Sequence, residues 1–340
     1  MGVRDQPLRA GLFIPADTPG SGGNARSAAR VAALVADGRV VADVLWHEGP
    51  VPTYDVYHAW NATRVGAALL AAGVDPHRLV VTWTGTDLGQ DWPRDSRGWA
   101  DQLAPVAHHV VFTEAARQTL EHDAPAWTDR VCVIPPSVDL TRFHPNGPRM
   151  SAPHPLFLMA GGIRPVKRIA WGIALVEHWR TQSGREAHLV IAGPIRDAAE
   201  GRRIAALAHP RSWVHLVGDQ PPDAMPRWYR TADVVLNTSL VEGVSNALME
   251  AMACGALVVA SDIPGNRALI TDCVSGRIFH DAPEFLTIMA ALARSPAVSR
   301  GLRVAARRIV EARYAPAAEA AAYARLYRAP VGSHLIHTTE

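Results

Sequence analysis

The chain has 340 residues, of which 48% are hydrophobic and 19% are charged, and its formal net charge is +2. This length predicts two domains of about 150 residues each, with the composition of a globular protein. The small net charge argues against nucleic acid or an anionic membrane surface as a partner.

Five short apolar runs in the first half of the sequence predict buried strands. They are rich in valine and bounded by turn residues, and helical patterns such as 24–38 lie between them. This alternation is typical of an α/β domain with a parallel sheet, which we place at residues 1–150. The expected strands are 10–16, 41–47, 55–60, 79–85 and 108–113.

A proline-rich segment, 134–155, predicts a linker, after which the same alternation begins again. We therefore predict a second α/β domain at residues 151–312, an alanine-rich helix at 315–329 and a loose tail at 331–340. The strands expected in the second domain are 155–162, 187–194, 212–218, 232–239 and 256–261.

The start of the sequence lacks the long apolar stretch of a signal peptide, and no run reaches the roughly 18 apolar residues of a membrane span. The three cysteines, Cys132, Cys254 and Cys273, match no metal-binding spacing. We expect buried thiols in a reducing cytoplasm, no bound metal and no transmembrane segment.

The first glycine-rich stretch, residues 19–30, has three interpretations. Gly20, Gly22 and Ala25 fit a loose dinucleotide fingerprint, with Asp43 or Glu48 as the ribose-binding acid, which would indicate an NAD-dependent oxidoreductase. Against this, residues 15–19 separate the glycines from the strand. We favour a loop in which the backbone N–H groups of Gly22 and Gly23 approach an anionic ligand group; a plain turn is the third interpretation.

A second glycine loop, "MAGGIRPVKR" at 159–168, follows an expected strand. Gly162 precedes Arg164 and Lys167, and a guanidinium fork beside an ammonium suits a diphosphate. The alternative is that these are solvated charges on an ordinary loop.

The third stretch is "EGVSNALMEAMACG" at 242–255. Ser245 is suited to cap a helix whose N-terminus favours an anion. Glu250 lies in the second turn, where its carboxylate can accept two hydrogen bonds from sugar hydroxyls, and Glu242 precedes the helix. Alternatively, both acids are ordinary surface charges.

Together these stretches resemble glycosyltransferase family 4, the glycosyl transferases group 1, over nearly the whole chain. The strongest elements are Glu242 and Glu250 eight positions apart, then "MACGALVVASDIPGNRALI" and "SGRIF". The resemblance implies the GT-B fold, in which two Rossmann-like, doubly wound α/β domains face each other across a cleft. It also implies that a C-terminal helix at 313–330 returns to the first domain.

The resemblance further implies that the second domain binds a nucleotide-sugar, with UDP-sugar favoured, as substrate and without another cofactor. Glu250 would bind its ribose and Glu242 its sugar, while Arg164 and Lys167 would hold the diphosphate. The groups expected to line the sugar and diphosphate are Gly243, Val244, Ser245 and Asn246, together with the glycine loop that contains Gly162. The sugar would be transferred with retention of configuration and, because the sequence has no D-x-D motif, without a metal.

On the acceptor side, the resemblance implies roles for His58 beside the donor sugar and for Asp87 in orienting or deprotonating the acceptor. Many members have a second histidine where Trp60 stands here, and core packing of His58 and helix capping by Asp87 are the alternatives.

The sequence is also similar to a narrower group that includes selenosugar synthases, which implies a phosphate- or selenophosphate-like acceptor near Arg26, Arg30 and Arg64. A glycan, a lipid-linked sugar and a small-metabolite hydroxyl remain alternative acceptors. A sugar-nucleotide epimerase and a catalytically silent nucleotide-sugar binding module remain alternative functions.

Overall fold

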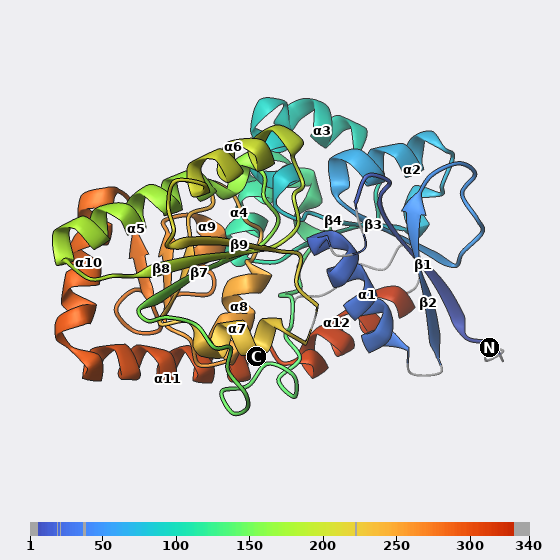
Figure 1. Ribbon diagram of the computed structural model, residues 1–340. Coiled ribbons are helices and arrows are strands. Elements are labelled where there is room, and N and C mark those ends of the chain that lie inside the picture. The colour runs from blue at the N-terminus through green and yellow to red at the C-terminus, as the bar shows by residue number, and fades with distance from the viewer. Residues whose placement is uncertain (1–5, 19, 21, 37–38, 222, 330–340) are drawn as a thin grey trace. The chain divides into compact units, whose positions relative to one another are not determined.

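Figure 1 shows the computed structural model, which describes residues 6–18, 20, 22–36, 39–221 and 223–329. The chain forms two compact units. The first contains the residues up to Ser137 and those from Pro316 onward, and the second is Val138–Ala315. The predicted tail at 331–340 lies outside the described residues.

The division between the units falls at Ser137 and Val138 rather than at 150 and 151. The predicted linker is anchored to the second unit by side chains of one helix. The Arg230 guanidinium donates to the carbonyls of His144 (3.1 Å) and Pro148 (2.9 Å), and Thr231 Oγ1 accepts from the Met150 amide at 2.7 Å. Because these backbone groups are satisfied within the second unit, the linker residues from 138 onward belong to that unit and do not form a flexible connection.

In the described part of the first unit, a six-stranded parallel sheet has the order β2-β1-β3-β4-β5-β6. Each predicted run contains a strand, so the α/β prediction is confirmed here. β6 was not predicted because its three residues are too short a run. The strands are β1 (Leu8–Pro15), β2 (Val40–His47), β3 (Val56–Trp60), β4 (Leu79–Thr82), β5 (His108–Val111) and β6 (Val131–Val133).

Helices cover both faces of this sheet, which is why β4 is buried along its whole length. Two single-turn π-helices follow β3 and β4, a geometry often found near functional sites. The helices are α1 (Gly23–Val35), α2 (Ala67–Ala71), α3 (Ser96–Gln102), α4 (Glu114–Asp123) and α12 (Pro316–Arg328). The short turns are η1 (Ala62–Gly66), η2 (Pro76–Arg78), η3 (Asp87–Asp91), η4 (Trp92–Arg94) and η5 (Pro125–Arg130).

The last helix, α12, packs beside α1 in the first unit (Figure 1). Its Glu319 is 3% exposed and accepts from Arg30 Nε at 2.9 Å, Arg30 Nη2 at 3.0 Å and the Ser137 amide at 3.0 Å. Through these contacts the Glu319 carboxylate links α12 to Arg30 of α1 and to Ser137, the last residue before the second unit. Burial of the same carboxylate without partners would destabilise the fold.

In the described part of the second unit, a six-stranded parallel sheet has the order β12-β11-β10-β7-β8-β9. The first strand, β7, lies in the middle beside β10, so the chain builds the sheet outward in one direction and then in the other. This is the doubly wound arrangement. The strands are β7 (Leu156–Ala160), β8 (His188–Ala192), β9 (Val214–Gly218), β10 (Val234–Asn237), β11 (Val258–Ser261) and β12 (Arg277–Phe279).

Apolar side chains from one face of this sheet pack against those of α5 and α10 to form one core. No helix in the described residues is long and apolar enough to cross a membrane. The helices of the second unit are η6 (Pro165–Lys167), α5 (Ile169–Ser183), α6 (Ala198–Ala208), α7 (Met225–Thr231), α8 (Asn246–Ala253), α9 (Pro264–Arg267), α10 (Ala282–Arg294) and α11 (Pro296–Arg313).

Candidate active site

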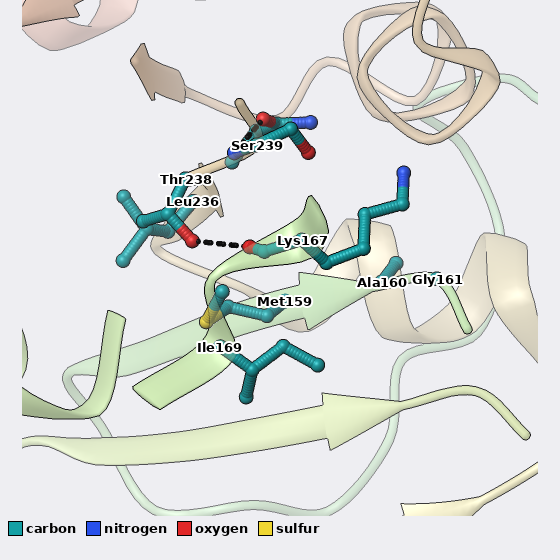
Figure 2. Close-up of a pocket in the computed structure, with 9 residues that line it drawn as sticks. Met159, Ala160, Gly161, Lys167, Ile169, Leu236, Thr238 and Ser239 are labelled. Carbon is teal, nitrogen blue, oxygen red and sulfur yellow. Dashed lines mark hydrogen bonds between the residues drawn. The ribbon is translucent and has the colours of Figure 1, made fainter. Parts of the chain in front are cut away.

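A pocket in the second unit opens at the carboxyl ends of β7 and β10, where the two halves of the sheet diverge. Open α/β sheets bind ligands at this kind of position, because the loops leave neighbouring strands in opposite directions. Figure 2 shows Lys167 extending beside Ala160 and Gly161 at the end of β7. The pocket is lined by Met159, Ala160, Gly161, Lys167, Ile169, Leu236, Asn237, Thr238 and Ser239.

The glycine loop after β7 is held by direct backbone contact with the loop after β8. Gly161 has φ of +140° and donates its amide to the Ala192 carbonyl at 2.8 Å. Gly193 has φ of +152°, and a Cβ there would lie 2.0 Å from the Gly161 carbonyl oxygen. Gly162 is restricted less strictly, since its Cβ would lie 2.5 Å from Cγ of the Arg196 side chain, which can move. The glycines therefore serve close packing of two loops at the pocket, as well as leaving backbone accessible.

Lys167 and Glu242 form an ion pair at the pocket, with 2.5 Å between Lys167 Nζ and Glu242 Oε1. Their side chains are only 17% and 11% exposed. Burial by itself raises the pKa of the Glu242 carboxyl. The Lys167 ammonium and the hydrogen bonds from Lys167, Ser239 and Asn237 outweigh it, so the net pKa lies below the ordinary value. Glu242 is therefore a carboxylate at neutral pH.

Lys167 is the only lysine in a sequence that has 34 lysines and arginines. The hydroxyl of Thr238 donates to the Lys167 carbonyl at 2.8 Å, which fixes the backbone of η6 against the end of β10. An ammonium is a compact point charge that deprotonates more readily than a guanidinium and fits a narrower space. Among the described residues, no ion pair or side-chain hydrogen bond engages Arg164, which lies at the start of the same turn.

Helix α8 begins where the sequence predicted, with Ser245 as its cap. Ser245 Oγ accepts from the Leu248 amide at 3.4 Å and from Asn237 Nδ2 at 3.3 Å. Asn246 is the first helical residue, and Glu250 accepts from the Tyr229 hydroxyl at 2.8 Å. The loop that carries Gly243 and Val244 precedes the cap and packs directly against Gly265 of α9.

Three polar residues near Glu242 were not predicted, namely Asn237 at the end of β10, Ser239 two residues later and Asn266 in α9. Asn237 and Ser239 contact Glu242, and Asn266 contacts Asn237. The signal in the sequence was the change from "VVL" to "NTS" at the end of an apolar run, because polar side chains at the carboxyl end of a parallel strand line this edge of the sheet.

The prediction for His58 is corrected by the structure. His58 is fully buried in the first unit, with Nδ1 at 2.6 Å from the Tyr327 hydroxyl and Nε2 at 2.6 Å from Thr82 Oγ1. Burial lowers the pKa of its imidazole to about 3, so the ring is neutral. Both ring nitrogens are occupied by core side chains, and His58 is a core residue rather than a sugar contact. Trp60, in the second-histidine position, is also fully buried beside it.

Asp87 is also corrected, because it is fully buried and organises two loops. Its Oδ2 accepts from the Ala62 amide at 2.9 Å, and its Oδ1 accepts from the amides of Thr84, Gly85 and Leu88 at 2.8 to 3.0 Å. Burial raises the pKa of the Asp87 carboxyl, and these backbone donors oppose that shift. A carboxylate with this set of partners joins the turns after β3 and β4, which is the capping role that was the alternative for Asp87.

The three arginines expected to bind an anionic acceptor near the first glycine loop differ in their exposure and in their ion-pair partners. Arg30 is paired with Glu319, and Arg64 donates to Asp17 at 2.9 Å in an exposed ion pair. Arg26 lies exposed on α1. Gly22 and Gly23 precede and begin that helix, which has no side-chain cap.

The dinucleotide interpretation of this loop does not fit the local geometry. β1 ends at Pro15 and α1 begins at Gly23, so the connection is not the tight turn that the fingerprint requires. The candidate ribose acid Asp43 instead accepts from the Tyr54 hydroxyl at 3.0 Å.

The family profile and the similar sequences that match this chain are described as glycosyltransferases. A family profile described as "Glycosyl transferases group 1" matches residues 154–295. A D-inositol 3-phosphate glycosyltransferase of Frankia alni is 30% identical over 284 residues, covering 75% of this chain and 70% of that protein. One of Xylanimonas cellulosilytica is 32% identical over 203 residues, covering 53% of this chain and 48% of that protein, so this alignment spans only about half of the relative.

Solved structures share the fold of both units at low sequence identity. The structure of Anabaena Alr3699/HepE in complex with UDP-glucose has a TM-score of 0.75 and 14% identity, covering 94% of this chain and 99% of that one. Sucrose-phosphate synthase from Thermosynechococcus elongatus has a TM-score of 0.74 and 18% identity, covering 94% and 98%. The fold is GT-B, as expected from the sequence.

Proposed function

The chain belongs to the glycosyl transferases group 1, and on that premise we propose that it transfers a sugar from a nucleotide-sugar, with UDP-sugar favoured, to an acceptor bound by the first unit. The proposal includes retention of anomeric configuration and independence of a metal ion. The observation that carries it is the Lys167–Glu242 pair at the divergence of the second sheet, where a donor would place its sugar and diphosphate.

Within this proposal, Lys167 and Arg164 neutralise the diphosphate, and Glu242 accepts hydrogen bonds from the hydroxyls of the donor sugar. The N-terminus of α8, with the amides near Gly243 and Ser245, contributes its positive dipole end to the same anion. Glu250, oriented by the Tyr229 hydroxyl, accepts from the two ribose hydroxyls. Lys167 has three N–H donors, so it can bind phosphate oxygen while it keeps its contact with Glu242.

The proposed step breaks the bond between the anomeric carbon and the diphosphate oxygen and forms a bond from the acceptor oxygen on the same face. The acceptor proton passes to the departing phosphate oxygen, so no protein side chain needs to serve as base. This fits the burial of His58 and Asp87, neither of which is available for that task. Fixed positive charge at the leaving group is worth about 3 kcal/mol of barrier for each donor removed.

The acceptor is proposed as a small phosphorylated compound. The relatives above are named for inositol 3-phosphate, and the narrower resemblance points to selenophosphate or phosphate. Arg26 is the exposed cation beside the first glycine loop, and Arg64 reaches the same region through its ion pair with Asp17. We place the reaction in the cytoplasm, which suits the three free thiols of the described chain.

The test is a transfer assay with a panel of UDP-, GDP-, ADP- and TDP-sugars and with inositol 3-phosphate, phosphate and selenophosphate as acceptors. Lys167→Met and Glu242→Gln should each lower transfer by about 100- to 1,000-fold while circular dichroism stays that of the parent. Arg168→Met, which removes a neighbouring charge stacked on Trp171, is the matched control and should retain activity. Normal transfer by both site variants would refute the assignment.

The same assay separates the other functions. Conversion of the nucleotide-sugar without an acceptor would indicate an epimerase, and binding without any turnover would indicate a binding module. Adding EDTA should leave the rate unchanged, because Lys167 and Arg164 supply the cationic charge; loss of activity restored by Mg²⁺ would refute metal independence.

A further inference from the structure

Two buried asparagines connect the end of β11 to the Glu242 carboxylate. Asn266 Nδ2 donates to the Ser261 carbonyl at 2.9 Å and to Asn237 Oδ1 at 3.3 Å. Asn237 Nδ2 donates in turn to Glu242 Oε1 at 3.4 Å. Asn266 is fully buried and Asn237 is 8% exposed, so water does not compete for these groups. The last member of the chain is the carboxylate that pairs with Lys167.

The direction of this chain of amides is fixed at both ends. Ser261 presents a carbonyl, which only accepts, so the NH₂ group of Asn266 must face it. Asn237 Oδ1 also accepts from the Ser239 amide at 2.9 Å, which only donates. With its oxygen so engaged, Asn237 turns its NH₂ group toward Glu242. A reversal of either amide would bring two oxygens together in a buried site, at a cost of about 1–3 kcal/mol.

The loops that carry the two amides are also in direct contact. Ser261 Oγ donates to the Ser239 carbonyl at 2.7 Å. A Cβ on Gly265 would lie 2.3 Å from the Glu242 carbonyl oxygen, so the start of α9 touches the backbone of Glu242 itself. β11 and α9 therefore contribute to the position of Glu242, although none of their residues lines the pocket.

Packing alone does not account for an amide at position 266. Its Oδ1 is buried and has no hydrogen-bond partner among the described residues. A buried acceptor left unpaired is unfavourable, and an apolar side chain of similar volume would avoid that cost. The group of Asn266 that contacts the site is its NH₂ group, which donates to Asn237 Oδ1.

We propose that Asn266 and Asn237 act as a pair of positioning residues that hold Glu242 as an oriented carboxylate for the donor sugar, with Asn266 acting only through Asn237. The inference rests on the proposed function in one respect, that Glu242 addresses the donor. Lys167, on η6, is the charged group that faces Glu242 in the described chain. Asp262, at the start of the α9 loop, is engaged by Arg267 and His280.

The test uses the single lysine as a spectroscopic probe. Protein labelled with [¹³Cε]lysine gives one side-chain signal, that of Lys167, whose shift with pH reports the ionisation of its partner Glu242. Asn266→Asp, once its carboxyl is ionised, puts an acceptor-only group against Asn237 Oδ1 and adds a negative charge near Glu242, and both effects raise the Glu242 midpoint. Asn266→Leu, which removes the same donor without adding a charge, is therefore titrated beside it and should also raise the midpoint. The midpoint of the Glu242 titration should rise by at least about one pH unit. Asn146→Asp, at an exposed loop position, is the matched control and should not move it.

A second variant separates positioning from folding. Asn266→Leu removes the donor and the unpaired oxygen together but also takes a donor from the buried Ser261 carbonyl. The protein should therefore fold with a melting temperature lowered by about 2–12 °C, while turnover of nucleotide-sugar falls by about 10- to 100-fold. An unmoved Glu242 midpoint in Asn266→Leu, or parental turnover in the same variant, would overturn the proposal. Failure of both variants to fold would overturn it too, because the amide would then be a structural core group.

The lysine titration and the turnover assay distinguish failure of the positioning role from failure of the proposed function. The lysine signal is recorded without donor, so a moved midpoint in a protein that binds no nucleotide-sugar would refute the proposed function and leave the coupling of Asn266 to Glu242 established. Normal donor turnover by the wild type with no effect of either variant would refute only the positioning role.

Discussion

Replacing Gly265 by alanine places a methyl group against the backbone of the loop that carries Glu242. The added Cβ would lie 2.3 Å from the Glu242 carbonyl oxygen and 2.8 Å from the Gly243 carbonyl oxygen. Carbon atoms do not approach carbonyl oxygens this closely, and both neighbours are backbone rather than the end of a flexible side chain. The loop must therefore move away from α9.

The expected size of the effect follows from the cost of inserting a methyl group where there is no space. Overpacking of this kind costs about 1–3 kcal/mol. A unit of this size loses about 2–4 °C of melting temperature for each kcal/mol, so we expect a decrease of about 2–12 °C. Displacement of Glu242 relative to Lys167 should also lower donor turnover by about 10- to 100-fold, because alignment of the reacting groups is sensitive to shifts of about 1 Å.

The assay is differential scanning calorimetry together with steady-state turnover of the nucleotide-sugar. Gly301→Ala is the matched control, because Gly301 lies within α11 and a Cβ there meets nothing within 4 Å. Alanine is a better helix former than glycine by about 0.5–1 kcal/mol, so this variant should be slightly more stable and fully active. A Gly265→Ala protein with the melting temperature and turnover of the wild type would refute the reasoning.

Two further predictions concern the first unit. The His58 pKa is about 3 in the folded protein and about 6.5 when unfolded, so unfolding takes up a proton as the pH falls below 6.5. His58 should therefore remove about 2 kcal/mol of stability between pH 6.5 and pH 5, and His58→Gln should reduce the pH dependence of urea unfolding by that amount, while burial of His108 and His109, which lowers their pKa values, leaves a remainder. An unchanged pH dependence in the variant would contradict the assignment. Glu319→Gln should lower the free energy of unfolding of the first unit by about 2–3 kcal/mol, because it removes the buried negative charge that pairs with Arg30 and replaces one acceptor oxygen by an NH₂ group. Asp17→Asn, which breaks an exposed pair with Arg64, should cost less than about 1 kcal/mol, and equal effects of the two substitutions would show that burial is not the cause.

Much of the fold could be predicted from the sequence because its signals are local. Valine-rich runs between turn residues gave ten of the strands, and the serine cap at 245 gave the start of α8. The strands β6 and β12 were missed because each has only three residues. Lys167 and Glu242 were predicted as site residues from their place in the family pattern, and the structure brings them to 2.5 Å although they are far apart in the sequence.

The sequence by itself determined the α/β class, the GT-B resemblance and the acids and cations of the second unit, because these follow from periodicity, turn chemistry and short motifs. Only the tertiary structure decided which polar side chains are already buried or paired and which remain exposed to a ligand. His58 is neutral because Tyr327 of α12 closes over it, and Arg30 is unavailable because Glu319 of the same helix pairs with it. Asn266 reaches Glu242 only through a residue on another strand. Burial and hydrogen-bond partners come from segments distant in the chain, so no local pattern carries that information.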